Sequence, residues 1–227
     1  MANISDDRPP PLRALLREGV ALGARIYRGF GHLGERGPMD GAPLMVVPGF
    51  LATDRTTLGL QRALAGAGYR VSGWGMGWNR GVRGDTLERL AGRIEAFGRG
   101  RPVILLGWSL GGIYAREAAK LRPELVAKVV TLGSPFSGDP RGNNVWRIYE
   151  WVAGHPVDAP PVHVDLAVKP PVPTLAIWSR LDGIVAVCAA RGEACESDCQ
   201  VELDCSHMGF AVSARAYPKI VEAIRDF

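Results

Sequence analysis

The stretch GWSLG, residues 107–111, contains the residue type and spacing that most clearly could perform chemistry. An apolar run at 103–106 precedes it, and apolar residues at helical spacing follow it over 110–121. A serine between two glycines at a sharp strand-to-helix turn has the context of a nucleophile elbow. Such a turn strains the serine backbone, and the glycines allow the strand and helix to approach closely. The pattern predicts Ser109 as a nucleophile for acyl transfer.

A serine hydroxyl needs a base that accepts its proton, and histidine is the usual base. His207 follows the last predicted strand, in the segment DCSHMGF. The other histidines lie in the N-terminal segment or in a predicted cap: His32, His155 and His163. We therefore expect His207 to act as the base.

The base must in turn be oriented by an acid. Asp182 follows the predicted strand 173–178 and completes the chain order serine, aspartate, histidine that is typical of one class of hydrolases. Asp139 and Asp204 are competing candidates, because one follows the preceding strand and the other lies close to His207. Asp182 is favoured by its place after the expected strand.

A tetrahedral oxyanion needs two hydrogen-bond donors. In this arrangement one donor is the backbone amide after the nucleophile, here Leu110, and the other comes from the loop after the first central strand. That loop reads VVPGFL, residues 46–51, and predicts Phe50 as the second donor. Gly49 gives the backbone freedom to turn the Phe50 amide inward.

The segments VVPGF, GWSLGG, TLGSPF, SRLDGIV and SHMGF together resemble the α/β-hydrolase superfamily, particularly its bacterial esterase and lipase-like members. The resemblance covers Pro43 to Phe227 and implies a Ser109, Asp182 and His207 triad without a cofactor or metal. It implies hydrolysis of a small-molecule ester or lipid. Many relatives have His-Gly where this chain has Pro48-Gly49, which changes the contacts beside the expected oxyanion donor.

Two further interpretations stay open. The same triad could serve an acyltransferase, thioesterase or amidase, because the fold does not fix the reaction. A binding protein that has kept the fold without its activity is the alternative from another class.

The elements that must position these residues follow an alternating pattern of short apolar runs and helical stretches from Pro43 onward. This pattern predicts an α/β fold with a mostly parallel central sheet and helices on both faces. The expected strands are 44–47, 69–73, 103–106, 126–132, 173–178 and 200–203. The expected helices are 57–67, 86–97, 109–121 and 211–226.

One long interruption, 136–171, predicts a small cap. Its large apolar residues could face the substrate or simply be buried on the domain. The residues expected to contact substrate are Trp108, Trp146, Tyr149 and Trp151. Either Trp74 or Trp78 could also line the pocket.

The N-terminal segment 1–42 predicts an amphipathic helix that packs on the domain, with a membrane-surface or lid role as the alternative. No signal peptide is recognisable, because charged residues interrupt the apolar stretch. No apolar run approaches the ~20 residues of a membrane span. We therefore expect a soluble, cytoplasmic protein of unknown oligomeric state.

Composition agrees with one domain at 43–227, since 47% of the 227 residues are apolar. The 27 basic and 23 acidic residues are spread along the chain and leave a net charge of +4, which does not indicate nucleic-acid binding.

All four cysteines, Cys188, Cys195, Cys199 and Cys205, fall in one short segment. Free thiols and local disulfides both fit this spacing, and a metal site fits it less well. Disulfides would indicate export.

Overall fold

The structure is a computed structural model, and it describes residues 10, 11, 18, 34–138 and 166–227. Most of the N-terminal segment and most of the predicted cap lie outside these residues. The predictions for Trp146, Tyr149 and Trp151 and for the competing acid Asp139 therefore lie outside the described part of the chain.

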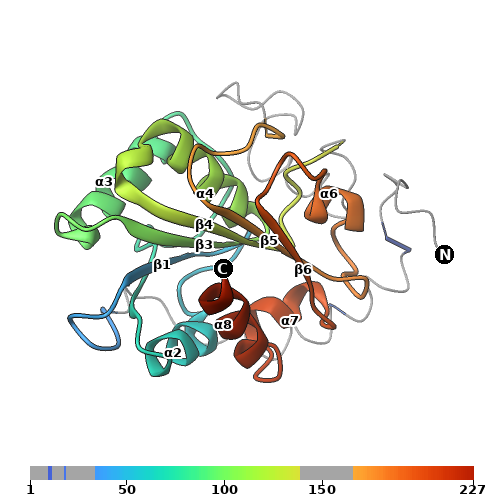
Figure 1. The fold of residues 1–227 in the computed structure, drawn as a ribbon, viewed down its shortest axis with the longest axis horizontal. Coiled ribbons are helices and arrows are strands. Elements are labelled where there is room, and N and C mark those ends of the chain that lie inside the picture. Colours follow the sequence, from blue (N-terminus) through green and yellow to red (C-terminus); the bar gives the residue numbers. More distant parts are fainter. Residues whose placement is uncertain (1–9, 12–17, 19–33, 139–165) are drawn as a thin grey trace.

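Six strands form one sheet in the order β2-β1-β3-β4-β5-β6, and every neighbouring pair is parallel (Figure 1). This confirms the predicted α/β class and its parallel sheet. The strands are β1 (Pro43–Val47), β2 (Arg70–Gly73), β3 (Val103–Trp108), β4 (Val126–Leu132), β5 (Thr174–Trp178) and β6 (Cys199–Glu202).

The strand order changes direction at β1, since β2 lies on one side of it and β3 on the other. In open parallel sheets, sites form beyond the carboxyl ends of the strands at such a switch point. Val47 pairs with Gly107 at the ends of β1 and β3, so the two following loops leave the sheet side by side. These loops carry Phe50 and Ser109.

Helices cover both faces of the sheet. Helices α3 and α4 lie on one face, and α2, α7 and α8 lie on the other (Figure 1). The helices are α2 (Leu58–Gly66), α3 (Thr86–Gly98), α4 (Leu110–Leu121), α6 (Val187–Arg191), α7 (His207–Val212) and α8 (Tyr217–Asp226), with a 3₁₀ turn at Pro123–Leu125.

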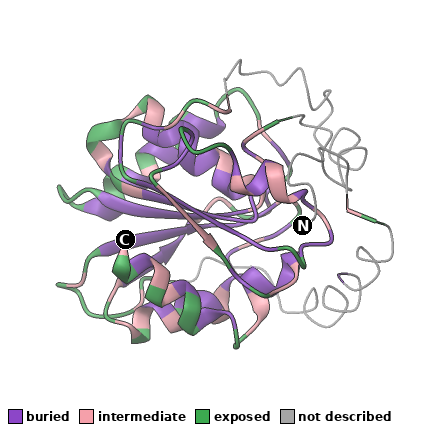
Figure 2. Cartoon of the chain, turned by 45° about the vertical axis from the view of Figure 1, so that its right-hand side comes forward, coloured by how far each residue is buried: buried purple, intermediate pink, exposed green. Residues whose placement is uncertain are grey.

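Alternate strand residues belong to two separate apolar cores, as the two-residue period of a strand requires. Leu44 and Val46 of β1 pack with the core beside α2 and α8, whereas Met45 and Val47 pack with the core beside α3 and α4. Figure 2 shows the strands buried and the outer surfaces of the helices exposed. A strand that is apolar on both faces explains why these segments read as continuous apolar runs.

The predicted C-terminal helix 211–226 is wrong, because the structure has two helices there. Helix α7 starts earlier, at His207, where the Ser206 hydroxyl caps it by accepting a hydrogen bond from Gly209 N at 3.2 Å. Ser213 has extended backbone angles and ends α7. Helix α8 then begins with a proline in its first turn, at Pro218, which favours a new start. The short helix α6 was also not expected, since five residues are too few to display a period.

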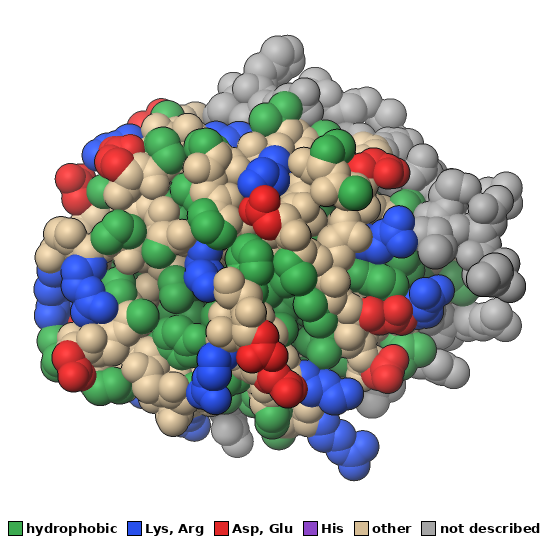
Figure 3. Space-filling view, viewed as in Figure 1, with side chains coloured by type: hydrophobic (Ala, Val, Ile, Leu, Met, Phe, Trp, Pro, Cys, Tyr) green, Lys and Arg blue, Asp and Glu red, His purple; other side chains and the backbone are tan. Residues whose placement is uncertain are grey.

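No helix in the described ranges is long and apolar enough to cross a membrane. On the face of the molecule seen in Figure 3, side chains of both charge signs are interspersed among apolar ones.

Arg116 of α4 is buried and ties three segments together. Its guanidinium donates to Glu196 O at 3.0 Å and to Val168 O at 3.2 Å, and it lies 4.1 Å from the centroid of the Phe136 ring. Burial lowers the pKa of Arg116 to about 10, although the charges of Glu196 and Glu117 oppose that change. Arg116 therefore stays charged near neutral pH. Its contacts with Phe136 and Val168 hold the described segments that lie before and after residues 139–165.

Replacing Arg116 by Met should lower the free energy of unfolding by about 3 kcal/mol, because buried carbonyl groups lose their donor. Urea denaturation would measure this loss. Arg122→Met is the matched control, since Arg122 lies six residues later, at the end of α4, with a side chain 41% exposed, and its loss should leave stability close to that of the wild type. Equal stability of the two variants would contradict the assigned role of Arg116.

The four cysteines are free thiols, so the disulfide alternative is not realised in this structure. Within the described residues, no group of three or more His, Cys, Asp or Glu side chains could hold a metal ion. Cys205 is half-buried, and burial, followed by the nearby charges of Asp182, Glu18 and Asp204, raises its pKa to about 12.

Cys205 should therefore resist alkylation by iodoacetamide at pH 8, where about one molecule in ten thousand would carry its thiolate. The exposed Cys195 should react readily. Mass spectrometry of the digested protein would distinguish the two sites, and alkylation in urea provides the control in which all four thiols react. Modification of Cys205 as fast as that of Cys195 would show that its thiol is not protected in this way.

Candidate active site

Ser109 lies at the turn between β3 and α4 with φ 55° and ψ −126°, a backbone conformation that residues other than glycine rarely adopt. Gly107 and Gly111 flank it, and neither position has space for a side chain. A β-carbon at Gly107 would collide with the backbone of Gly111, and one at Gly111 would collide with Val47 O of β1. The strained turn expected from the sequence is present, and it projects Ser109 from the carboxyl end of the sheet.

Asp182 and His207 form a buried pair in the loops after β5 and β6. Asp182 Oδ2 lies 2.7 Å from His207 Nδ1, and the residues are 5% and 2% exposed. The second carboxylate oxygen, Oδ1, accepts hydrogen bonds from Ile184 N and Val185 N, both at 2.8 Å. The turn therefore presents one oxygen of Asp182 to the imidazole and holds the other. The competing acid Asp204 is exposed on the protein surface.

Trp108 connects the turn of Ser109 to the loop of His207. Its indole Nε1 donates to His207 O at 3.1 Å, and the two ring centroids are 5.6 Å apart. Ser109 is the next residue along the chain. Among the described residues, no hydrogen bond joins the Ser109 hydroxyl to His207. Catalytic hydrogen bonds often tighten only when substrate is bound.

The charge environment favours the protonated form of His207. Burial of the imidazole lowers its pKa, but the charge of Asp182, the hydrogen bond that His207 donates to Asp182 and the charge of Glu18 act in the opposite direction. The net result is a pKa of His207 above its ordinary value. A neighbouring carboxylate therefore stabilises the imidazolium that a general base forms when it accepts a proton.

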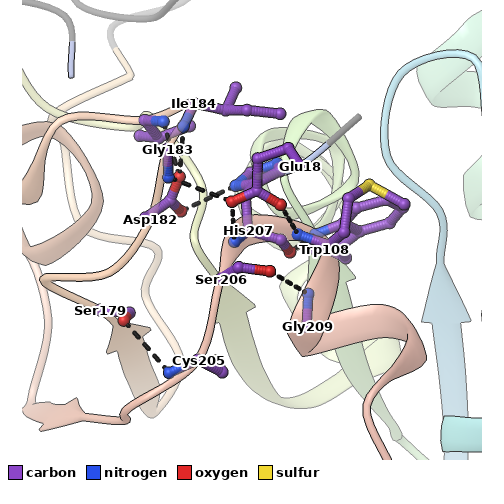
Figure 4. A network of polar contacts seen from close by, with 12 residues as sticks. Glu18, Trp108, Ser179, Asp182, Gly183, Ile184, Cys205, Ser206, His207 and Gly209 are labelled. Atoms are coloured by element: carbon purple, nitrogen blue, oxygen red, sulfur yellow. Dashed lines mark hydrogen bonds and ion pairs between the residues drawn. The ribbon is translucent and has the colours of Figure 1, made fainter. Parts of the chain in front are cut away.

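Glu18 was not identified by the sequence reasoning. Its buried carboxylate accepts hydrogen bonds from the backbone N–H groups of Gly183, His207 and Met208 (Figure 4). These partners lie 165 to 190 positions away in the sequence. The only possible signal was an acidic residue in an otherwise basic amphipathic segment, and this does not indicate a site.

Asn79 supports the loop expected to supply the second oxyanion donor. Its side-chain Nδ2 donates to Pro48 O at 2.8 Å, and its backbone O accepts from Leu51 N at 2.7 Å. Leu51 has a positive φ of 55°, which turns the chain sharply just after Phe50. A β-carbon at Gly49 would lie 3.1 Å from Ser109 Cβ, so this loop directly borders the turn of Ser109.

The other expected donor, Leu110, is the first residue of α4. Amides in the first turn of a helix have no acceptor within the helix, so they can bind an anion. Asn79 was not predicted from the sequence, which drew attention to the neighbouring tryptophans of the 73–81 stretch, although Asn79 is a polar residue in a glycine-rich turn.

Two of the tryptophans expected near substrate are buried in the protein. Trp108 makes the contact with His207 described above, and Trp74 stacks on Tyr114 with ring centroids 6.4 Å apart. Contact between Trp108 and substrate stays a prediction, since its described contacts are with the protein.

No protein-family model matches this chain. A triacylglycerol lipase from Pseudarthrobacter phenanthrenivorans is 31% identical to it over 107 residues, which cover 42% of this chain and 34% of the lipase. The matched segment thus spans about a third of that relative.

Solved structures match over most of the chain. The thioesterase domain from the curacin biosynthetic pathway has a TM-score of 0.61 at 11% identity, and the match covers 85% of this chain and 94% of that domain. An α/β-hydrolase enzyme from a sediment metagenome of the Mar Chica lagoon has a TM-score of 0.56 at 22% identity, covering 88% of this chain and 99% of that enzyme. Together with the parallel sheet and the loops at its carboxyl edge, these likenesses show that the chain has the α/β-hydrolase fold.

Proposed function

We propose that this chain is a serine hydrolase that cleaves carboxylic esters through an acyl-enzyme intermediate on Ser109. The observation that carries the proposal is the buried Asp182–His207 pair, which lies against the tryptophan preceding a serine in a strained strand-to-helix turn. Nucleophile, base and orienting acid then come from three loops at one edge of the sheet. This is the arrangement expected for acyl transfer.

In the first half of the reaction, Ser109 Oγ attacks the ester carbonyl carbon while His207 Nε2 accepts the hydroxyl proton. Asp182 stabilises the resulting imidazolium through His207 Nδ1–H. The backbone amides of Phe50 and Leu110 donate to the oxyanion of the tetrahedral intermediate. The intermediate collapses, the carbon–oxygen bond to the alcohol breaks, and His207 returns the proton to the leaving alcohol.

In the second half, a water molecule attacks the carbonyl carbon of the acyl-enzyme, and His207 accepts a proton from that water. The new tetrahedral intermediate expels Ser109 Oγ, which recovers its proton from His207 as the carboxylic acid leaves. Ester and water are thus converted to acid and alcohol, and the reaction needs no cofactor.

Two exposed leucines, next in sequence to proposed catalytic residues, support a substrate that carries apolar groups. Leu51 follows Phe50 and is 41% exposed, and Leu181 precedes Asp182 and is 55% exposed. The partial likeness to a triacylglycerol lipase also favours an ester substrate. We therefore propose esters with an apolar acyl or alcohol part.

A thioesterase is the second candidate, favoured by the structural likeness to a thioesterase domain. It would use the same acyl-enzyme with a thiol as leaving group. An acyltransferase or an amidase would also form this acyl-enzyme intermediate. A non-catalytic binding protein would not form it. Measuring the rates of hydrolysis of p-nitrophenyl esters and acyl thioesters in parallel would show whether the esterase or the thioesterase activity is greater.

Ser109→Ala should abolish ester hydrolysis, with a loss of about 10⁴-fold or more in turnover, because the attacking oxygen is removed. Initial rates on p-nitrophenyl esters from acetate to palmitate, for wild type and variant in parallel, provide the measurement. A fluorophosphonate probe should label the wild type at Ser109 and leave the variant unlabelled. Substantial turnover by the variant on the same esters would exclude Ser109 as nucleophile. A folded wild type that neither turns over nor takes the label would favour the binding-protein alternative.

Asn79→Ala should lower kcat by about 10- to 100-fold, because the loop carrying Phe50 loses the hydrogen bond to Pro48 O while the donor amide itself remains. Tyr114→Phe is the matched control. It removes a hydroxyl that donates to Asn79 Oδ1 at 3.3 Å but leaves the bond from Asn79 to Pro48 intact. The control should retain most of the activity. If both variants keep wild-type kcat with normal melting temperatures, the loop is not positioned through Asn79.

A further inference from the structure

Glu18 brings a buried carboxylate to the two loops that carry Asp182 and His207. The residue is 3% exposed. Its Oε1 accepts from His207 N at 2.8 Å and from Gly183 N at 3.2 Å, and its Oε2 accepts from Met208 N at 2.9 Å. Figure 4 shows the Glu18 carboxylate beside the imidazole and above the start of α7.

Burial of this carboxylate needs compensation, because an ionised group loses its hydration inside a protein. Among the described residues, no lysine or arginine pairs with Glu18. Its compensation comes from three backbone N–H groups, and hydrogen bonds to a charged acceptor are stronger than those between neutral groups. These hydrogen bonds therefore hold the carboxylate and the three backbone segments in a fixed relative position.

Those donors belong to the catalytic loops themselves. Gly183 follows Asp182, and one of the other two donors is the amide of His207. The carbonyl of His207 accepts from Trp108 Nε1 at 3.1 Å, so both polar backbone groups of this residue are hydrogen-bonded to side chains. A single side chain thus joins the acid loop to the base loop.

We infer that Glu18 is a positioning residue that joins the Asp182 and His207 loops and places a second negative charge beside the imidazole. This inference rests on the proposed function, since it assigns Glu18 a part in the activity of the same triad.

The charged groups that act on His207 are Asp182 from the loop after β5 and Glu18 from the N-terminal segment, and the thiol of Cys205 lies two residues earlier in the His207 loop. The high pKa of Cys205, about 12, keeps that thiol neutral, and the more distant Asp204 and Lys219 act on Cys205. The charges of Asp182 and Glu18 raise the pKa of His207 against the effect of burial. Loss of the Glu18 charge should therefore lower that pKa.

Glu18→Gln removes the charge while its remaining oxygen can still accept from His207 N and Gly183 N. Because neutral His207 is the active base, the acid limb of kcat/KM should move to lower pH, by at least about half a unit. Plateau kcat should fall, since the imidazolium formed in the transition state loses one stabilising charge.

Glu18→Ala removes all three hydrogen bonds and should lower kcat by about 10- to 100-fold with little change in KM. Glu18→Asp keeps the charge on a side chain shorter by one methylene. It should restore the acid limb toward the wild-type position while recovering only part of kcat.

Glu35→Gln is the matched control for charge loss. Glu35 pairs with Arg70 and Arg99, away from the catalytic loops, so its loss should affect stability without moving the acid limb. Melting temperatures of all variants would be measured alongside the kinetics.

The pKa of His207, followed by NMR of its ring protons and assigned through the signal lost in His207→Ala, gives a readout that does not need activity. A lower pKa in Glu18→Gln than in wild type supports the inference, even if the wild type hydrolyses no ester and the proposed function fails. An unchanged pKa and acid limb in Glu18→Gln would restrict Glu18 to a stabilising role and overturn the inference, even with an active wild type.

Discussion

The 2.7 Å contact between Asp182 Oδ2 and His207 Nδ1 is the constraint on which the rest of the site depends. Both side chains are almost fully removed from water, so the carboxylate is stable there only while its oxygens are bonded. Two amides of the following turn hold one oxygen, and the imidazole takes the other. This geometry requires β5 and β6 to end together, and their register, with Trp178 opposite Glu202, places both loops at the same edge of the sheet.

The same parallel register acts at the switch point. Val47 and Gly107 are partners at the ends of β1 and β3, so the loop of Phe50 and the turn of Ser109 emerge together. Strand pairing alone does not connect these two loops with those of Asp182 and His207. The connection is made by polar contacts between loops, notably from Trp108 to the His207 carbonyl. The sheet therefore sets the approximate place of each group, and a few buried hydrogen bonds set the final geometry.

This division explains which parts could be predicted from the sequence. The strands, the turn at Ser109 and the order Ser109, Asp182, His207 depend on local patterns, and the structure contains the expected strands and the contact between Asp182 and His207. Glu18 and Asn79 were missed because their partners are backbone groups, which every residue possesses and no pattern marks. The division between α7 and α8 was missed because apolar spacing continues through it, while the Ser206 cap and the extended Ser213 determine the helix ends.

Two carboxylates beside one imidazole have opposite effects on the resting protein and on the transition state. In the resting state, the carboxylates of Asp182 and Glu18 are both buried, which opposes folding unless each is compensated by hydrogen bonds. In the proposed reaction, both charges would stabilise the imidazole once it accepts a proton, because backbone amides already hold them in place. These two buried carboxylates share one kind of compensation, hydrogen bonds from backbone amides: Gly183, Ile184, Val185, His207 and Met208. In the proposed reaction, the free energy that folding loses by burying these charges would lower the barrier to the step in which positive charge develops on His207.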